Sequence, residues 1–501
     1  MGIFDRINKT ENQPKNSTKG FYFGATEAEG ENVKGSSLLD YFDDYLNILG
    51  QLEVGKYIFT GRKGVGKSAI AKFIKDTADK TDDSFAKILR ISDFELEKTI
   101  QGTEQQSNKE KLVFEWLILV NIVKLIVSNE CGEYTNEYTK LKKFLDTNAG
   151  IVNIDRYEVV AGEKNKGGEV SFGGLKHIFG GVFKNYFTTN VNKAPFYKLI
   201  PPLKDILKII LDYPVNKELE FWLLFDDLDI NFNVKSEQDN KKVMELIRVS
   251  KEYNNEIFKD NNAKILIFIR DDMRDNLKTK YADSAKIFNA YEVFINWFNT
   301  TYNENEIPLK QLADKRIEIN FKKQNISFND NAWDYLFKKD FYNGKTSFKY
   351  ILDFTFYRPR DIITFLNSMT NSNYKYPISK NTVKTLLKSY ITTNITEIKS
   401  ELNLFFSNSE INKIFNILFP FIIQNTHLKT KELLDKIISI EFDIDAEGVL
   451  NLLRKYSLII VKDSKDNIYF NYRENTDLDI NKSELYYTLP KCIYHNYRTI
   501  N

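Results

Sequence analysis

Cysteine and histidine are scarce in this chain of 501 residues. Its two cysteines, Cys131 and Cys492, cannot build a disulfide framework, and such scarcity is typical of a reducing compartment. His177 has no second ligand at metal-binding spacing, so we assign it no metal chemistry. We therefore expect a cytoplasmic protein without a zinc site.

Neither sign of charge dominates the chain. Lys and Arg number 71 and Asp and Glu 69, a net charge of +2, so no global field favours a nucleic-acid or membrane partner. The longest apolar run, residues 113–127, contains Glu115, Asn121 and Lys124 and is shorter than the about 20 residues that span a bilayer. We predict a buried helix there and no membrane partner.

The length predicts about three domains, at roughly 100 to 200 residues each. The N-terminal residues are polar and lack the apolar core of a signal peptide, which favours a disordered leader. We place boundaries by composition and periodicity: a leader and entry segment (1–36), an α/β core (37–296), a helical lid (297–405) and a winged-helix-like domain (406–501).

Apolar runs without alternation predict the strands of the core. A helix over 38–49 leads into the run "YIFT", and similar runs follow at 87–92, 220–225, 264–269 and 291–295. Strands that are buried on both faces have such unbroken apolar sequences. We therefore predict that the fold class is α/β with a parallel five-stranded sheet. The long gap between the second and third strands predicts an insertion at about 100–215.

The insertion contains a glycine-rich stretch, residues 162–181, with seven of the chain's 22 glycines. This stretch is either a hairpin that senses a partner or a loose surface insertion. After residue 297, helical periodicity replaces strands. Near the C-terminus, short helices precede a hairpin formed by "SLIIVKD" and "NIYFNYR", an order typical of a winged helix.

The segment "GRKGVGKS" matches the phosphate-binding pattern G-x-x-x-x-G-K-[ST] between a predicted strand and a helix. Its backbone N–H groups would face phosphate, Lys67 would reach the β- and γ-phosphates in both binding and catalysis, and Ser68 would ligate Mg²⁺. Arg62 and Lys63 either touch phosphate or lie solvated on the outer face. The predicted nucleotide ligands are Gly61, Arg62, Lys63, Gly64, Val65, Gly66, Lys67, Ser68 and Ala69.

Paired acids follow the third strand in "FWLLFDDLD". Ligands of open α/β sheets bind at the carboxyl ends of strands, so Asp226 is the predicted Mg²⁺-side acid and Asp227 the acid that orients attacking water. Arg270 ends the next strand and would contact the γ-phosphate if that strand neighbours the P-loop strand. Arg274 could act in a neighbouring subunit, although Asp271, Asp272 and Asp275 offer both arginines local ion pairs.

The segment "YRPRDIITFLN" begins a predicted lid helix, with Pro359 suited to its first turn. Arg360, and with less support Arg358, would contact the γ-phosphate and couple nucleotide state to the lid. The alternative is that both arginines bond protein carbonyls nearby.

In this order, "GRKGVGKSAI", "LLFDDLD", "IFIRDDM" and "RPRDIITFLN" resemble bacterial P-loop ATPases related to the STAND and KAP groups, within the division that includes AAA+ proteins. The resemblance covers about residues 20–370, including the entry segment "FYFGATEAEGEN". It implies strand order 5-1-4-3-2, a lid, a winged helix, and ATP and Mg²⁺ as cofactors. It also implies Arg270 and Arg360 as sensors of the γ-phosphate.

One departure from the family concerns Asp227, where many relatives have Glu; a shorter acid predicts slow turnover. The resemblance implies a regulatory switch that forms homo-oligomers and controls a separately encoded protein effector, in anti-phage defence. The alternatives are a DNA-acting ATPase of the initiator or loader kind, a nucleotide-binding scaffold, and a small-molecule kinase, which the lid disfavours. Residues 427–501 hold 11 basic and 12 acidic residues, which disfavours a nucleic-acid partner.

Overall fold

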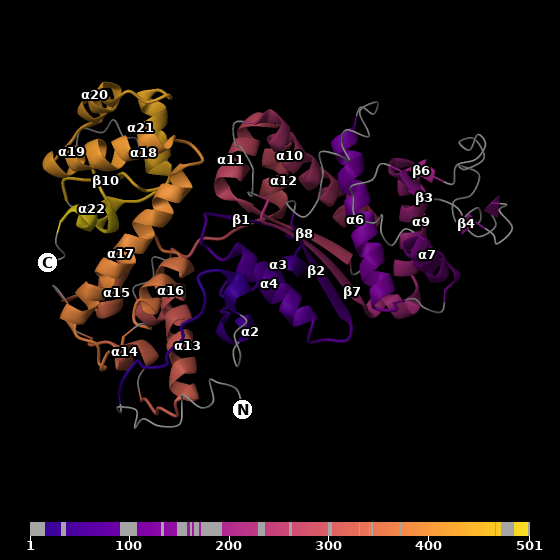
Figure 1. Ribbon diagram of the computed structural model, residues 1–501, viewed down its shortest axis with the longest axis horizontal. Helices are drawn as coiled ribbons and strands as arrows, with labels where there is room; N and C mark the ends of the chain where they lie inside the picture. Colours follow the sequence, from indigo (N-terminus) through magenta and orange to yellow (C-terminus); the bar gives the residue numbers. More distant parts are fainter. Residues whose placement is uncertain are drawn as a thin grey trace. The chain divides into compact units, whose positions relative to one another are not determined.

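The computed structural model describes most of the chain in two compact units (Figure 1). The first unit comprises Met1–Tyr45, Gly64–Gly66 and Asn296–Asn501, and the second Leu46–Lys63 and Lys67–Ile295. The domain boundaries drawn from the sequence remain predictions. The residues described are 16–31, 37–90, 108–131, 135–147, 158–160, 163–164, 170–171, 193–228, 236–259, 263–298, 303–329, 331–339, 341, 344–370, 372–465, 467–471 and 485–498.

The second unit is built on a parallel five-stranded sheet. Its order is β2-β7-β8-β1-β9, which is the predicted order 5-1-4-3-2 read from the opposite edge. All five strands coincide with the apolar runs of the sequence, and the predicted fold class is confirmed. The strands are β1 (Ile58–Gly61), β2 (Ser84–Arg90), β7 (Glu220–Asp226), β8 (Ala263–Arg270) and β9 (Glu292–Phe294).

Helices cover both faces of this sheet, with α4 below it and α10 and α11 above it in Figure 1. β1 is buried throughout and β7 from Phe221 to Asp226, which explains why these strands lack alternation. The helices near the sheet are α3 (Ile48–Glu53), α4 (Lys67–Ala78), α10 (Glu237–Glu252), α11 (Asp271–Lys280) and α12 (Ser284–Tyr291).

The chain between β2 and β7 forms the predicted insertion. Its centre is α6 (Lys109–Ser128), which is buried over most of its length as predicted. Beside α6 lie α7 (Asn136–Thr147) and α9 (Ile200–Leu211). Of the glycine-rich stretch, the described residues form one short antiparallel pair, β4 (Glu163–Lys164) with β5 (Val170–Ser171); His177 lies outside the described residues. No helix in the described part of the chain is long and apolar enough to cross a membrane.

One local prediction is wrong. The single helix expected over 38–49 is two short helices, α2 (Leu38–Tyr41) and α3, separated by residues without helical geometry. Phe42 is extended and Asn47 has a φ of 49°, so the backbone turns between the helices. The apolar spacing reflected buried side chains on two separate helices, Leu38 on α2 and Ile48 on α3.

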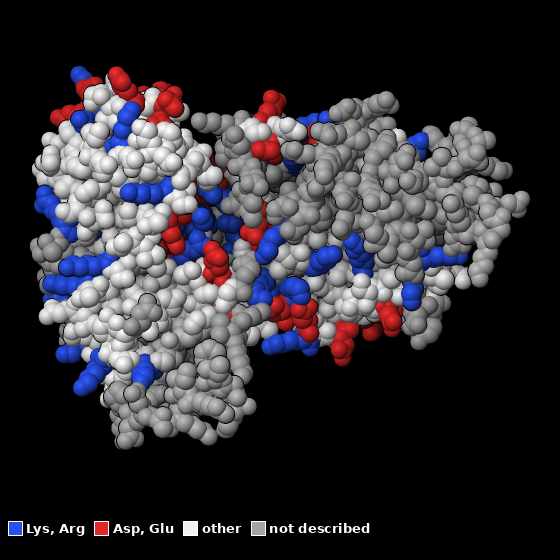
Figure 2. All heavy atoms as spheres, viewed as in Figure 1, with Lys and Arg blue, Asp and Glu red and all other residues white. Residues whose placement is uncertain are grey.

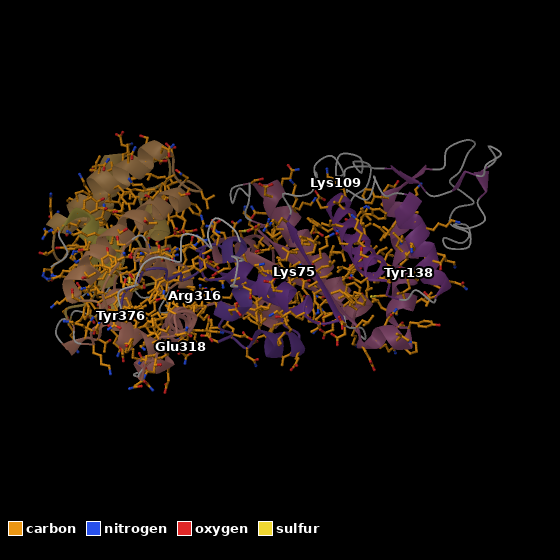
Figure 3. All side chains as sticks on the ribbon, turned by 60° about the horizontal axis from the view of Figure 1, so that its bottom comes forward. Lys75, Lys109, Tyr138, Arg316, Glu318 and Tyr376 are labelled. Atoms are coloured by element: carbon orange, nitrogen blue, oxygen red, sulfur yellow. The ribbon has the colours of Figure 1, made fainter. Side chains whose placement is uncertain are left out.

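The first unit contains the N-terminal segment, residues 16–31, docked on α13 (Pro308–Lys323). Asn320 exchanges two hydrogen bonds with the backbone of Tyr22, at 2.7 and 2.8 Å. One turn earlier, Arg316, which Figure 3 labels, donates to the Phe23 carbonyl (2.6 Å) and pairs with Glu31 (2.9 Å). Side chains of α13 thus hold the backbone of a distant segment.

The predicted lid is helical in the structure. Its helices after α13 are α14 (Ala332–Leu336), α15 (Ser347–Leu352), α16 (Pro359–Asn367) and α17 (Lys380–Leu402). Short helices follow: α18 (Asn408–Lys413), α19 (Phe419–Gln424), α20 (Thr430–Ile440) and α21 (Ala446–Lys455). A three-stranded antiparallel sheet of β10 (Ile460–Lys462), β11 (Ile468–Tyr469) and β12 (Tyr486–Thr488) comes next, then α22 (Lys491–Tyr497). The sequence analysis predicted β10 and β11 but missed β12 and α22.

We predict that Asn320→Ala destabilises the first unit by about 2 kcal/mol, because it leaves the Tyr22 N–H and carbonyl without their buried partner. Urea denaturation measures the loss. Asn381→Ala, on the exposed face of α17, is the matched control and should leave the unfolding midpoint unchanged. Equal midpoints for Asn320→Ala and the parent would contradict a structural role for this contact.

Candidate nucleotide site

The predicted phosphate loop lies between β1 and α4. Gly64 and Gly66 have φ values of 82° and 100°, a region that other residues enter at a cost, so glycine is needed at both. A Cβ at Gly64 would also lie 3.2 Å from the Cβ of Arg360. The ammonium of Lys67 donates to the carbonyls of Gly61 (2.9 Å) and Arg62 (3.2 Å), which directs it into its own loop. The contacts of Lys67 and of the loop with phosphate stay predictions.

The two metal-side residues predicted from distant motifs meet in the structure. Ser68, in the first turn of α4, lies near enough to Asp226, at the end of β7, for its hydroxyl to lower the pKa of that carboxyl. Burial, and then the charge of Asp227, raise the pKa of Asp226 to about 6, while Ser68 and Lys67 oppose this rise. A hydroxyl and a carboxylate are hard oxygen ligands that suit Mg²⁺.

Asp227 faces a partner that the sequence analysis missed. One of its carboxylate oxygens lies 2.9 Å from Nε of Arg90, the last residue of β2. Arg90 stands beside Asp226 in the register of the two strands, and Asp227 has a φ of 53°. The signal was a basic residue at the end of a strand, which gains meaning only when β2 is known to neighbour β7.

Arg270, the last residue of β8, and Arg274, in α11, form ion pairs with acidic residues of their own unit. β8 lies between β7 and β1, as the prediction for Arg270 required, but the buried guanidinium of Arg270 pairs with Asp272 at 2.7 and 3.1 Å. Arg274 pairs with Asp275 (2.7 Å) and Glu292 (3.0 Å). Local pairing, the alternative weighed in the sequence, is therefore what the structure shows; contact with phosphate stays a prediction.

The lid arginines have different surroundings. Arg358 is buried and pairs with Asp361 (2.9 Å) and Glu401 (3.3 Å), which joins α16 to α17; its contact with phosphate stays a prediction. Arg360 donates from Nε to the Thr26 carbonyl (3.3 Å) and from its backbone N–H to the Gly64 carbonyl (3.4 Å). Arg360 thus lies against the tip of the loop, whereas Arg358 belongs to the core of the lid.

The remaining residues of the loop differ in how far they are buried. Val65 is buried, and Arg62, Lys63 and Ala69 are half-buried. Arg62 and Lys63 are thus not fully solvated on the outer face. Among the described residues, no group of three or more His, Cys, Asp or Glu could hold a metal by itself. A protein that binds Mg²⁺ together with a nucleotide needs only one or two protein ligands, because phosphates and water complete the shell.

Comparisons with known proteins find similarity over parts of the chain. Residues 308–399, which include α13 to α16 and most of α17, match the family model described as the FunZ-associated C-terminal helical domain. A putative transposon gamma-delta 80.3 kDa protein of Escherichia coli (strain K12) is 24% identical over 217 residues. This match covers 41% of this chain and 30% of that protein, so it spans less than a third of the relative.

Among solved structures, the Aeropyrum pernix ORC2 protein, in ADPNP–ADP complexes, is similar over 90% of each chain, with 12% identity and a TM-score of 0.37. We draw no argument about function from an overlap of this size. The strand order and the position of the loop between β1 and α4 are the features that give this chain an α/β P-loop core.

The raised pKa of Asp226 predicts a pH dependence of stability. Between the usual pKa of an unfolded Asp, about 4, and about 6, the folded chain binds more protons than the unfolded chain, so stability falls as pH rises through this window. Asp226→Asn should flatten this slope and stabilise the metal-free protein at pH 8, by at most about 3 kcal/mol.

Urea denaturation at pH 4 to 8 without Mg²⁺ measures the slope. Asp82→Asn, at an exposed site of the same unit, is the control and should keep it. If Asp226→Asn showed the same slope as the parent, the carboxyl of Asp226 would not be the group that titrates.

Proposed function

We propose that this chain is a P-loop ATPase that binds ATP with Mg²⁺ and hydrolyses the γ-phosphate. The observation that supports the proposal is the placement of Asp226, at the end of β7, near enough to Ser68 and Lys67 of α4 for both to lower its pKa. A phosphate loop alone indicates only an anion site, whereas Ser68 and Asp226 add the oxygen ligands of a metal next to it. The strand order brings them together at the carboxyl edge of the sheet.

Each group of residues at the proposed site has its own role. The loop N–H groups and Lys67 bind the phosphates, and Ser68 and Asp226 would hold Mg²⁺. Bound Mg²⁺ neutralises charge that develops on the phosphates. With a pKa of about 6, Asp226 is largely ionised at neutral pH and is ready to accept a cation. Asp227 is the carboxylate placed to orient the attacking water.

The ion pair between Arg90 and Asp227 supports slow turnover. A carboxylate that is already paired with a guanidinium is less available to orient a water. The short side chain of Asp227, which many relatives replace by the longer Glu, also favours slow turnover. Both features fit a switch, in which the duration of the ATP state matters more than the rate of product formation.

We predict that Asp227→Asn lowers kcat by about 100-fold with ATP affinity nearly unchanged, because the amide cannot accept a proton from water. Lys67→Ala should instead weaken ATP binding at least tenfold. Phosphate release and equilibrium binding measure the two effects. Asp76→Asn, which removes only the ion pair with Lys72 on α4, is the control. An Asp227→Asn protein that hydrolyses ATP as fast as the parent would remove Asp227 from this role.

For the biological role, a DNA-directed ATPase is the candidate that the comparisons favour. The curated relative bears the name of a transposon protein, and mobile elements act on DNA. The C-terminal order of α20, α21 and an antiparallel sheet is that of a winged-helix-like domain. The role as a defence switch with a separate effector, like the relation to the STAND and KAP groups, rests on motif resemblance alone, and we rank it second.

Charge sets the limits of a DNA-directed role. Between residues 430 and 447, Glu432, Asp435, Glu441, Asp443, Asp445 and Glu447 are all exposed. Figure 2 shows acidic side chains gathered over α20 and α21, with few basic ones among them. Phosphates of DNA would be repelled there, so this face does not serve as the DNA contact.

We expect the full chain to bind duplex DNA more tightly with ATP and Mg²⁺ than without nucleotide, with an affinity that falls steeply as salt rises. Fluorescence anisotropy with a labelled duplex at 50 to 200 mM salt measures this. Lys67→Ala, which cannot respond to ATP, is the control. If the parent bound no DNA in either state but changed its sedimentation with ATP, the defence-switch role would move ahead.

A further inference from the structure

Two carbonyl groups at the tip of the phosphate loop accept hydrogen bonds from residues far along the chain. The indole N–H of Trp297 donates to the Val65 carbonyl at 2.8 Å, and the backbone N–H of Arg360 donates to the Gly64 carbonyl at 3.4 Å. Gly64–Gly66, Trp297 and Arg360 all belong to the first unit. The tip of the loop is thus contacted from the side of its carbonyls.

The direction of a carbonyl fixes the direction of the neighbouring N–H. In a planar trans peptide, the C=O and the N–H of the same peptide point in opposite directions. When Trp297 fixes the Val65 carbonyl, it also fixes the N–H of Gly66 on the other side. N–H groups of this loop are the donors that a phosphate accepts. Glycine at 64 and 66 could otherwise turn these peptides with little resistance.

The indole of Trp297 is itself held in place. Trp297 is buried, and its ring lies against the ring of Tyr45, with centroids 4.1 Å apart. The hydroxyl of Tyr45 donates to the carbonyl of Asn296, the residue before Trp297, at 3.0 Å. The residue before Val65, Gly64, lies against the side chain of Arg360. The donor to Val65 therefore has one orientation and is not a surface side chain that samples several.

We propose that Trp297 is a positioning residue for the nucleotide: its indole N–H orients the Val65–Gly66 peptide so that the Gly66 N–H faces the phosphates. Arg360 acts on the preceding peptide in the same way through its main chain. This inference rests on the proposed function and adds a residue to that site. The oriented Gly66 N–H contacts phosphate, so losing this orientation weakens the binding of any ligand with a phosphate chain and leaves the binding of a ligand without phosphate unchanged.

The test compares Trp297→Phe with Trp333→Phe in the full chain. Trp333 is a matched control, because it is buried in the same unit and its indole donates to Ser347 Oγ at 3.0 Å, so its replacement also loses one indole hydrogen bond. Isothermal titration with ATP and Mg²⁺ gives Kd, and thermal unfolding without nucleotide gives the loss of stability.

We expect Trp297→Phe to raise the Kd for ATP and for ADP about fivefold to tenfold, the effect of about one hydrogen bond. The Kd for adenosine, measured by competition, should stay unchanged. Trp333→Phe should lower the melting temperature while leaving all three Kd values within twofold of the parent. An equal loss for adenosine and ATP would mean general distortion of the site and would overturn the proposal.

A second variant keeps the test decisive if Trp297→Phe folds poorly. Replacing Trp297 by its benzothiophene analogue keeps the shape of the ring and removes only the N–H donor. The same selective loss of ATP affinity is expected. If the parent binds ATP and this protein binds it equally well, the inference about Trp297 fails. If the parent itself binds no nucleotide, the proposed function fails instead.

Discussion

The loop between β1 and α4 can bind phosphate only if its N–H groups face inward, and this requires its carbonyls to find donors elsewhere. Buried carbonyls without partners cost about 1 to 3 kcal/mol each, so the chain must supply them. Trp297 and Arg360 supply two of them at the tip of the loop. The residues that shape the loop therefore include some far from it in sequence, at the start of the lid segment and at the first turn of α16.

A second constraint comes from placing acids at the buried edge of a parallel sheet. Burial opposes the ionised form of Asp226, and the neighbouring charge of Asp227 opposes it further. Ser68 and Lys67 offset part of this penalty at Asp226, and Arg90 pairs with Asp227. Such an arrangement is less stable than one with neutral side chains at these positions, which is a common cost of acids gathered at a functional site.

The sequence predicted the parts of the structure that depend on local pattern. Strands buried on both faces appear as unbroken apolar runs, so β1, β7 and β8 were found, and the family resemblance supplied their order. The contacts of Asp227 with Arg90 and of Val65 with Trp297 were not predicted, because they join residues that no local period relates. β12 was missed for a similar reason: it is three residues long and pairs across a gap of more than 20 residues with β10.

The docking of residues 16–31 on α13 has a consequence for how the chain is made. Asn320, which holds the backbone of Tyr22, lies 298 positions after it. During synthesis, Phe21 and Phe23 therefore leave the ribosome long before the helix that buries them, and the whole second unit is completed in between. The earliest described segment must wait for α13 before it can dock, so a chain interrupted before α13 would expose these aromatic side chains and be prone to aggregate.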